Sequence, residues 1–502
     1  MGYALAAASG VLLALSFPKY GHPACGWIAL APLLLALSAR SVARTPPSST
    51  RSLVMGFVTG LIYFAGMLYW ITHVMAVYGD VPTWIAILIN GALVAYLACF
   101  PAMFALLVQR LVLARGRTAI LWSPFVWVAT EAARGYVTGF PWGMLGYSQA
   151  RALPIAQVAS VGGVYSVSLL LVAVSAALVV ALGRKYVPLV TVIALVVVVG
   201  VWGSRRIAAG VLTRAGEPVR VGLVQGNVDQ AMKWDPASAA RIFGDYVQQT
   251  RQAILEGATL VLWPESSTPF MFEEDPAGAA RLQALARQAK VTLIFGSDQI
   301  ERGSTTRFYN SAFLVRPDGT TGGVYRKMRL VPFGEYVPMQ SLLFFAQPLT
   351  EHIGTFTPGS RPQLLPANGH AVSVAICYEV VYPELVRQFV VEGSELLTTI
   401  TNDAWFGETS APYQHFEQAS MRAIENGRYL VRAANTGISG IVDPYGRVLQ
   451  RTDIFQPVVS IGDARFLTTT TMFTRHGELV AYLAIALTLV SVMLPSRASR
   501  TM

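Results

Sequence analysis

Three residues in the second half of the chain could act together on an acyl carbon. Cys377 follows the apolar run Val374–Ile376, Glu265 follows Leu260–Pro264, and Lys327 lies between them in the sequence. A thiol is mostly protonated at neutral pH, a carboxylate can accept its proton, and an ammonium group can stabilise the oxyanion of a tetrahedral intermediate. Together the three side chains predict covalent catalysis. A buried structural cysteine is the more common use of such a thiol, so Cys377 alone would not indicate an active site.

The sequence around these residues alternates between strand and helix patterns. This alternation predicts a layered α/β domain, in which functional side chains tend to lie where strands end. The predicted strands are Val219–Asn227, Leu260–Glu265, Val291–Gly296, Tyr309–Val315, Val372–Cys377, Leu396–Thr401, Tyr429–Ala433 and Gly440–Val442, and the predicted helices are Ala237–Leu255 and Ala277–Ala289. We therefore expect all three chemical groups, Glu265, Lys327 and Cys377, at strand ends, where their loops can converge.

The composition indicates a membrane protein. Of the 502 residues, 53% are hydrophobic and only 13% are charged, which is far from the balance of soluble globular proteins. The net charge of +10 does not predict a nucleic-acid partner, because the basic residues form no stripe with interleaved aromatic residues. The 3 cysteines form no CxxC pair, so we expect neither a disulfide framework nor a zinc site, and no cluster of ligand-type residues predicts another metal or an organic cofactor.

Eight apolar runs are candidate membrane spans. They are Tyr3–Phe17, Ala24–Ala39, Leu53–Ala76, Trp84–Val108, Ile120–Ala129, Ile155–Leu182, Tyr186–Trp202 and Leu479–Leu494. The first two are shorter than the roughly 20 residues that cross a bilayer comfortably, which predicts tilted or distorted segments. The fifth is interrupted by Pro124. In the third run Gly56 and Gly60 form a GxxxG pattern, which favours helix packing.

The basic residues of the short loops predict the orientation of these spans. Four groups of them fall on the same side of the membrane: Arg40, Arg44 and Arg51; Arg110, Arg115 and Arg117; Arg184 and Lys185; Arg497 and Arg500. The opposite loops carry only scattered bases such as Lys19, Arg134 and Arg151. Because cytoplasmic loops are enriched in Lys and Arg, we expect both termini in the cytoplasm. The predicted parts are spans one to seven in 1–203, a periplasmic catalytic domain in 204–477, and the eighth span with a cytoplasmic tail in 478–502.

Three short motifs resemble the nitrilase, or carbon–nitrogen hydrolase, superfamily. They are Trp263–Glu265, Tyr325–Lys327 with Phe333–Glu335, and Cys377–Glu379. Each motif is weak alone, but the set is specific, and Asn402–Gly407 and Arg422–Asn426 agree with it. The superfamily carries a Glu-Lys-Cys triad in a four-layer α-β-β-α sandwich. Together with membrane spans on both sides, the chain resembles the family of apolipoprotein N-acyltransferases along essentially its whole length.

The resemblance implies a role for each matched position. Glu265 is expected to be the general base, Lys327 the oxyanion stabiliser and Cys377 the nucleophile. Glu335, Tyr378 and Glu379 are expected to support them, although either acid could instead belong to an ordinary ion network. Trp234 matches a functionally important tryptophan of the family.

Further residues are candidates for substrate contact. Trp142, in the aromatic and glycine-rich loop 139–147, and Trp405 could contact lipid, although packing or anchoring at the membrane interface is an equally good interpretation. Phe344 and Phe345 belong to an apolar run that could dip into the membrane as a lid or could form a short packed helix.

The resemblance also implies a reaction and partners. Cys377 would take an acyl chain from a phospholipid, typically phosphatidylethanolamine, and the thioester would pass it to the N-terminal amine of a diacylated apolipoprotein. The protein is expected to act as a monomer without a cofactor. The main alternative is a membrane-anchored amidase or nitrilase that hydrolyses a small amide, because the triad alone does not select an amine over water. A transporter with an inactive sandwich is less favoured, because the apolar runs contain almost no ionisable residues.

Overall fold

The computed structural model describes residues 1–38, 47–230, 232–233, 235–332, 334–336 and 356–493. The chain divides into two compact units, one of Met1–Ala209, Thr409–Met421 and His476–Met502, the other of Gly210–Glu408 and Arg422–Arg475. The boundary falls inside helix α15 (Ala411–Asn426), so this helix contributes residues to both units.

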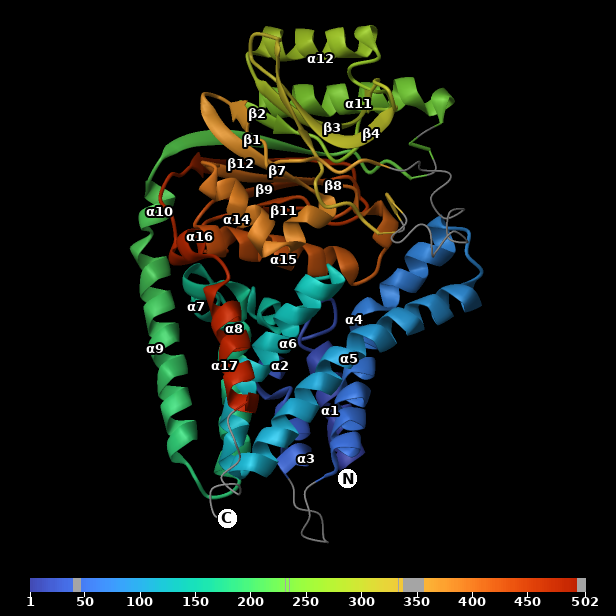
Figure 1. Ribbon diagram of the computed structural model, residues 1–502. Helices are drawn as coiled ribbons and strands as arrows, with labels where there is room; N and C mark the ends of the chain where they lie inside the picture. The colour runs from blue at the N-terminus through green and yellow to red at the C-terminus, as the bar shows by residue number, and fades with distance from the viewer. Residues whose placement is uncertain (39–46, 231, 234, 333, 337–355, 494–502) are drawn as a thin grey trace. The chain divides into compact units, whose positions relative to one another are not determined.

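The first unit is built from apolar helices (Figure 1). They are α1 (Gly2–Ala14), α2 (Ala24–Ile28), α3 (Ala31–Ser38), α4 (Ser49–Tyr78), α5 (Thr83–Arg115), α6 (Ser123–Thr138), α7 (Leu153–Ala156), α8 (Ala159–Ala181), α9 (Val187–Ala209) and α17 (Leu479–Met493). Among the described residues, four segments are long and apolar enough to cross a membrane: Ser49–Tyr78, Thr83–Arg115, Ala159–Ala181 and Val187–Arg214. Three shorter apolar helical stretches are Gly2–Ala14, Ala24–Ser38 and Leu479–Met493.

Helices α4 and α5 pack closely through small residues. A side chain on Gly56 would place its Cβ 2.3 Å from the carbonyl oxygen of Pro101, and one on Gly60 would lie 2.7 Å from the Cα of Ala98. Distances this short leave room only for hydrogen, so the predicted packing role of the GxxxG pattern is confirmed.

The fifth predicted span was wrong in its bounds. Helix α6 begins at Ser123 with Pro124 in its first turn, and it continues to Thr138. Proline is tolerated in a first helical turn because its missing N–H would have no partner there, so Pro124 starts the helix and does not interrupt it. The extension carries Arg134, which was expected in a loop but lies in this helix and is buried. Its guanidinium donates to the carbonyl oxygens of Phe140 and Trp142 at 3.0 and 2.7 Å.

The loop after α6 is packed inside the first unit. Residues 141–150 are all buried, and polar side chains satisfy much of the backbone. Leu145 N–H donates to Glu131 Oε1 at 2.6 Å, and Gly146 N–H donates to Ser168 Oγ at 2.9 Å. Irregular backbone in an apolar unit requires such partners. For residues 141–147 this burial favours the packing interpretation over an aromatic anchor at the membrane interface.

The second unit contains two six-stranded mixed sheets. The first has the order β12-β1-β2-β3-β4-β5 and the second β11-β10-β9-β8-β7-β6. Their strands are β1 (Glu217–Gln225), β2 (Leu260–Leu262), β3 (Thr292–Glu301), β4 (Arg307–Val315), β5 (Thr321–Arg326), β6 (Leu365–Ala367), β7 (His370–Ile376), β8 (Leu396–Thr401), β9 (Leu430–Ala434), β10 (Gly440–Val442), β11 (Val448–Arg451) and β12 (Val458–Phe466). The predicted layered α/β architecture is confirmed.

Helices cover the outer faces of these sheets (Figure 1). α11 (Pro236–Leu255) and α12 (Pro276–Ala289) lie on the first sheet, and α14 (Pro383–Val391) lies on the second. The first of these interfaces is a core rich in aromatic side chains, among them Phe243, Tyr246, Trp263, Phe295 and Phe313. Two short helices, α10 (Val211–Arg214) and α16 (Met472–His476), complete the elements near the ends of the unit. This core includes Val261 on β2 and Phe295 on β3, so it packs against the strand that leads to Glu265 and against its neighbour.

Candidate active site

Three strand ends supply the predicted chemical groups. Glu265 follows β2, Lys327 follows β5 directly, and Cys377 follows β7 directly. Cys377 has a φ of 52° and opens the short 3-10 turn Cys377–Val381. The prediction that Cys377 lies at the end of a buried strand is confirmed. A positive φ is strained for any residue with a Cβ, so the surrounding contacts must hold this turn in place.

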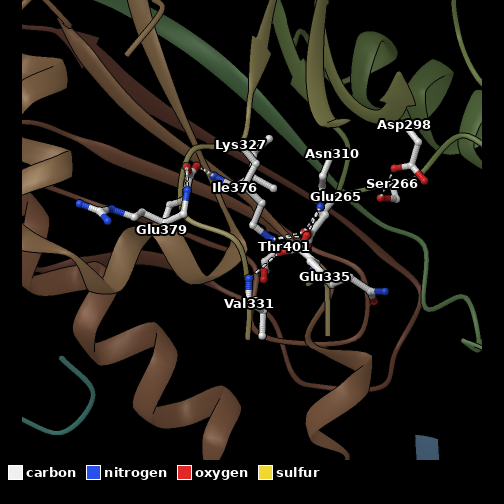
Figure 2. A network of polar contacts seen from close by, with 12 residues as sticks. Glu265, Ser266, Asp298, Asn310, Lys327, Val331, Glu335, Ile376, Glu379 and Thr401 are labelled. Carbon is white, nitrogen blue, oxygen red and sulfur yellow. Dashed lines mark hydrogen bonds and ion pairs between the residues drawn. The ribbon is translucent and has the colours of Figure 1, made fainter. Parts of the chain in front are cut away.

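The ammonium of Lys327 lies between two carboxylates (Figure 2). Its Nζ is 2.9 Å from Glu265 Oε1 and 2.9 Å from Glu335 Oε1. All three side chains are buried. Two of the predicted triad residues and the predicted second glutamate are thus brought into direct contact.

Asn310, which the sequence interpretation missed, bridges the same two acids. Its Nδ2 donates to Glu265 Oε1 and to Glu335 Oε1, at 2.8 Å each. Its Oδ1 is buried and accepts no hydrogen bond from the residues that the structure describes. The available signal was an amide side chain within the apolar strand β4, where a polar residue needs a buried partner.

The charges of the cluster support one another. Burial alone would raise the pKa of Glu265, but the Lys327 ammonium and the hydrogen bonds from Lys327 and Asn310 outweigh it and hold the pKa below its usual value. Burial would lower the pKa of Lys327, but Glu265 and Glu335 overcome this and raise it well above its usual value. Glu265 is therefore a carboxylate and Lys327 an ammonium at neutral pH.

The thiol has the opposite tendency. Burial, followed by the negative charge of Glu265, raises the pKa of Cys377 far above that of a free cysteine, although Lys327 opposes the increase. In the resting site the proton is therefore on sulfur, and a carboxylate that can accept it lies in the same cluster. This distribution suits a nucleophile that is deprotonated only as it attacks.

Glu379 ties the turn that carries Cys377 to the segment after Lys327. Its Oε2 accepts from Ile376 N–H at 2.7 Å, and its Oε1 accepts from the Tyr325 hydroxyl at 2.7 Å. Oε1 also accepts from Met328 N–H and Arg329 N–H, at 2.6 and 3.1 Å. Burial raises the pKa of Glu379 to about 7, although these donors oppose the increase. The carboxylate fixes the spacing between two strand ends.

The neighbouring Tyr378 is buried, and its ring meets that of Tyr382 edge to face, with centroids 5.2 Å apart. Both predicted supporting residues of the nucleophile turn therefore pack inside the protein. These contacts support the turn that begins at Cys377.

Glu265 is also fixed through its backbone and its second oxygen. The N–H of Asn402, at the end of β8, donates to Glu265 Oε2 at 2.9 Å. Behind the glutamate, a Cβ on Gly296 would lie 2.7 Å from Glu265 Cα and 2.3 Å from Ser266 N. Glycine is therefore required at position 296 for the backbone of Glu265 to reach its place. Ser266 has a φ of 42°, which marks a tight turn after the glutamate.

The structure describes two of the five residues predicted to contact substrate. Trp405 is half-buried in the short turn Asp403–Phe406 after Asn402, close in sequence to the site. Trp142 is buried in the first unit, where its Nε1 donates to Gln414 Oε1 at 2.8 Å and its ring lies 5.2 Å from that of Trp70. Trp234, Phe344 and Phe345 lie outside the described residues. Within the described residues, no group of three or more potential ligands could hold a metal ion.

Comparisons with known proteins match both halves of the chain. Residues 9–177 match the N-terminal domain of apolipoprotein N-acyltransferase, and residues 220–470 match the carbon–nitrogen hydrolase domain. An apolipoprotein N-acyltransferase from Geobacter metallireducens is 41% identical over 96% of this chain and 93% of its own length. One from Methylococcus capsulatus is 34% identical over 94% and 92%. Among solved structures, an amidase from Nesterenkonia sp. is 24% identical, covering 54% of this chain and 97% of its own, with a TM-score of 0.39.

Replacement of Gly296 by alanine should displace Glu265. The added methyl group overlaps the backbone of residues 264–266, so we expect activity to fall by at least about tenfold and stability by about 1–3 kcal/mol. Activity and thermal unfolding of the purified variant measure both effects. Gly303→Ala is the matched control, because the nearest atom to its Cβ is 3.9 Å away. A fully active Gly296→Ala variant would contradict the close approach.

The raised pKa of Cys377 predicts how the thiol reacts with iodoacetamide. Because the thiol is protonated in the resting site, its alkylation rate should rise roughly tenfold per pH unit from about pH 7 to about pH 9, without a plateau. The measurement needs a background in which Cys25 and Cys99 are replaced by serine, so that Cys377 is the sole thiol. A plateau below about pH 8 would show a thiolate already present at rest.

Proposed function

Because the chain belongs to the apolipoprotein N-acyltransferase family, we propose that it transfers an acyl chain from a membrane phospholipid to the N-terminal amine of a diacylated apolipoprotein. Phosphatidylethanolamine is the proposed donor. Glu265 is the proposed base, Lys327 the oxyanion stabiliser and Cys377 the nucleophile. The chain is thereby an acyltransferase of lipoprotein maturation.

The first half-reaction forms a thioester. Cys377 Sγ attacks the sn-1 ester carbonyl while Glu265 accepts the thiol proton, and the Lys327 ammonium stabilises the oxyanion of the tetrahedral intermediate. When the carbon–oxygen bond breaks, Glu265 returns the proton to the glycerol oxygen and a lysophospholipid leaves. The acyl chain remains on sulfur.

The second half-reaction uses the same groups in the same order. The amine of the lipoprotein attacks the thioester carbonyl, and Glu265 accepts a proton from the attacking nitrogen. The carbon–sulfur bond breaks, and the proton passes to the sulfur. The product is an amide, and the site returns to its starting protonation state.

One observation carries this proposal: Lys327 Nζ bridges Glu265 and Glu335 at 2.9 Å each, in the second unit that also holds the strained turn of Cys377. An ammonium placed on a carboxylate base suits acyl transfer through a tetrahedral intermediate. Both proposed substrates carry acyl chains, and helices that are long and apolar enough to cross a membrane would keep the protein at the surface where these substrates diffuse.

The acyl-enzyme can be trapped directly. Purified protein lacking Cys25 and Cys99 should become labelled by phosphatidylethanolamine that carries a radioactive sn-1 acyl chain, and hydroxylamine should release the label from a thioester. Cys377→Ala and Glu265→Gln should each reduce labelling at least about a hundredfold. An S-diacylglyceryl-cysteine peptide added afterwards should acquire the label. Release of the label only as free fatty acid would favour hydrolysis, and no labelling of the Cys377 protein would refute the proposal.

We further propose that the chain crosses the cytoplasmic membrane eight times, with both termini in the cytoplasm and the residues between α9 and α17 in the periplasm. Support comes from the basic residues of the short loops, such as Arg184 and Lys185 between α8 and α9. The segment Val187–Arg214 then leads out of the membrane towards β1. This orientation places the proposed active site where secreted lipoproteins are modified.

Fusions to alkaline phosphatase, which is active only outside the cytoplasm, test this orientation. A fusion after Lys185 should be inactive and one after Gly216 should be active, since a single span separates the two positions. A fusion to a cytoplasmic reporter at the same two positions is the control and should give the reverse pattern. Activity of the phosphatase after Lys185 would contradict the proposed topology.

A further inference from the structure

A second lysine is buried behind the proposed base. Lys233 is 6% exposed, and its Nζ lies 3.3 Å from the backbone carbonyl oxygen of Glu265. It also lines a small cavity together with Glu265, Ser266 and Asn435. No step of the proposed reaction uses it, yet a buried lysine is costly unless its charge has partners.

The surroundings of Lys233 are negatively charged. Burial lowers the pKa of Lys233, but Glu265, then Asp298 and Cys377, oppose the decrease. Asp298 lies on β3 and accepts a hydrogen bond from Ser266 Oγ at 3.0 Å (Figure 2). Ser266 directly follows Glu265 in the chain. Burial raises the pKa of Asp298 to about 6, which Lys233 counteracts. Lys233 therefore lies among groups whose charge it balances.

A set of side-chain amides holds the segment that carries Lys233. Asn435, at the end of β9, donates to Val228 O at 2.7 Å and to Asn402 Oδ1 at 3.0 Å. Asn402 Nδ2 donates to Gln230 Oε1 at 2.6 Å. Lys233 N–H then donates to Asp229 O at 3.1 Å. Val228 and Gln230 are thus bonded to the same strand ends that position Glu265, and Lys233 is bonded to Asp229 between them.

We propose that Lys233 is a positioning residue for the base: its ammonium holds the backbone of Glu265 and, together with Lys327, keeps the Glu265 side chain ionised. This inference rests on the proposed function, because it assigns Lys233 to the proton transfer that Glu265 performs. The groups that face Glu265 are the two lysines, Asn310, Glu335, Asp298 and Cys377. Two cations therefore balance several acids.

The sign of the expected pH effect follows from charge. Glu265 accepts protons only as a carboxylate, so the rate falls as the pH drops through its pKa. Removing a nearby positive charge raises the pKa of a carboxylate, by about one unit or more for a neighbour within roughly 4–6 Å. Loss of the Lys233 charge should therefore move the acid limb of the rate profile to higher pH.

The test separates the effect of the positive charge of Lys233 from the effect of its hydrogen bond. Lys233→Gln removes the charge and keeps a hydrogen-bond donor, Lys233→Met removes both, and Lys233→Arg keeps the charge. Acyl-enzyme formation on Cys377 is measured from about pH 3 to about pH 8, because the pKa of Glu265 lies below its usual value. We expect the acid limb to move up by about one pH unit in the Gln and Met variants and to stay in place in the Arg variant. Lys290→Asn is the matched control: this exposed lysine lies in the same unit, and asparagine tolerates its φ of 55°.

Each outcome decides the inference. An unchanged acid limb in the Gln and Met variants, with a rate lowered equally at every pH, would show a purely structural contact and overturn the proposal. If the Arg variant does not fold, agreement between the Gln and Met variants still tests the charge. The ionisation of Glu265 can also be followed without an acyl donor, as the pH dependence of the carboxylate infrared band that is absent from the Glu265→Gln variant. Its midpoint should lie about one pH unit higher in Lys233→Gln than in wild type. This titration tests Lys233 even if wild-type protein forms no acyl-enzyme, the result that would refute the proposed function alone.

Discussion

The site depends on one buried ammonium shared by two carboxylates. Lys327 Nζ contacts Glu265 and Glu335, and Asn310 donates to the same two oxygens. Two acids of like charge could not be buried so near each other without these donors between them. Removing one partner of such a group leaves a buried charge unpaired, at a cost of about 3–5 kcal/mol. Substitutions here will therefore affect folding as well as chemistry, so each activity loss needs a stability measurement beside it.

The same constraint explains the strained backbone around the cluster. Three residues with positive φ and a Cβ follow the ends of β1, β2 and β7: Asn227 at 49°, Ser266 at 42° and Cys377 at 52°. This conformation costs on the order of 1–3 kcal/mol at Ser266 and Cys377 and persists there only where the surroundings enforce it, whereas asparagine tolerates it more readily. Here the enforcing contacts are visible: Asn435 holds the loop after β1, Gly296 admits the backbone of Glu265, and Glu379 holds the turn of Cys377.

The sequence was sufficient for the elements whose pattern is local. Apolar runs that end in a polar residue predicted β2 and β7, because a buried strand and its exit are both visible in consecutive residues. Asn310 and Lys233 were not predicted, because their partners lie far away along the chain and only the fold brings them together. β12 was missed for the same reason: it pairs with β1 from Glu217↔Phe466 to Gln225↔Val458.

In the first unit, hydropathy was insufficient to predict the bounds of one helix. Hydropathy ended the fifth span at Ala129, because Glu131 and Arg134 read as the start of a polar loop. In the structure both are buried, and each serves the irregular backbone of residues 140–146. Hydropathy scores each residue by its own transfer cost. It cannot register that a charged side chain and unsatisfied backbone groups compensate each other inside an apolar unit.

Under the proposed mechanism, the pairing of Lys327 with two acids also explains how one base can serve two half-reactions. When Glu265 accepts a proton it becomes neutral and no longer holds the ammonium by charge. Glu335 still does, at 2.9 Å, and its second oxygen is fixed by Val331 N–H at 2.7 Å. The Lys327 ammonium therefore stays in place while the tetrahedral intermediate carries its oxyanion. In a site with a single acid, protonation of that acid would also remove the only negative charge that holds the ammonium. Here Glu265 accepts the proton and Glu335 holds the ammonium.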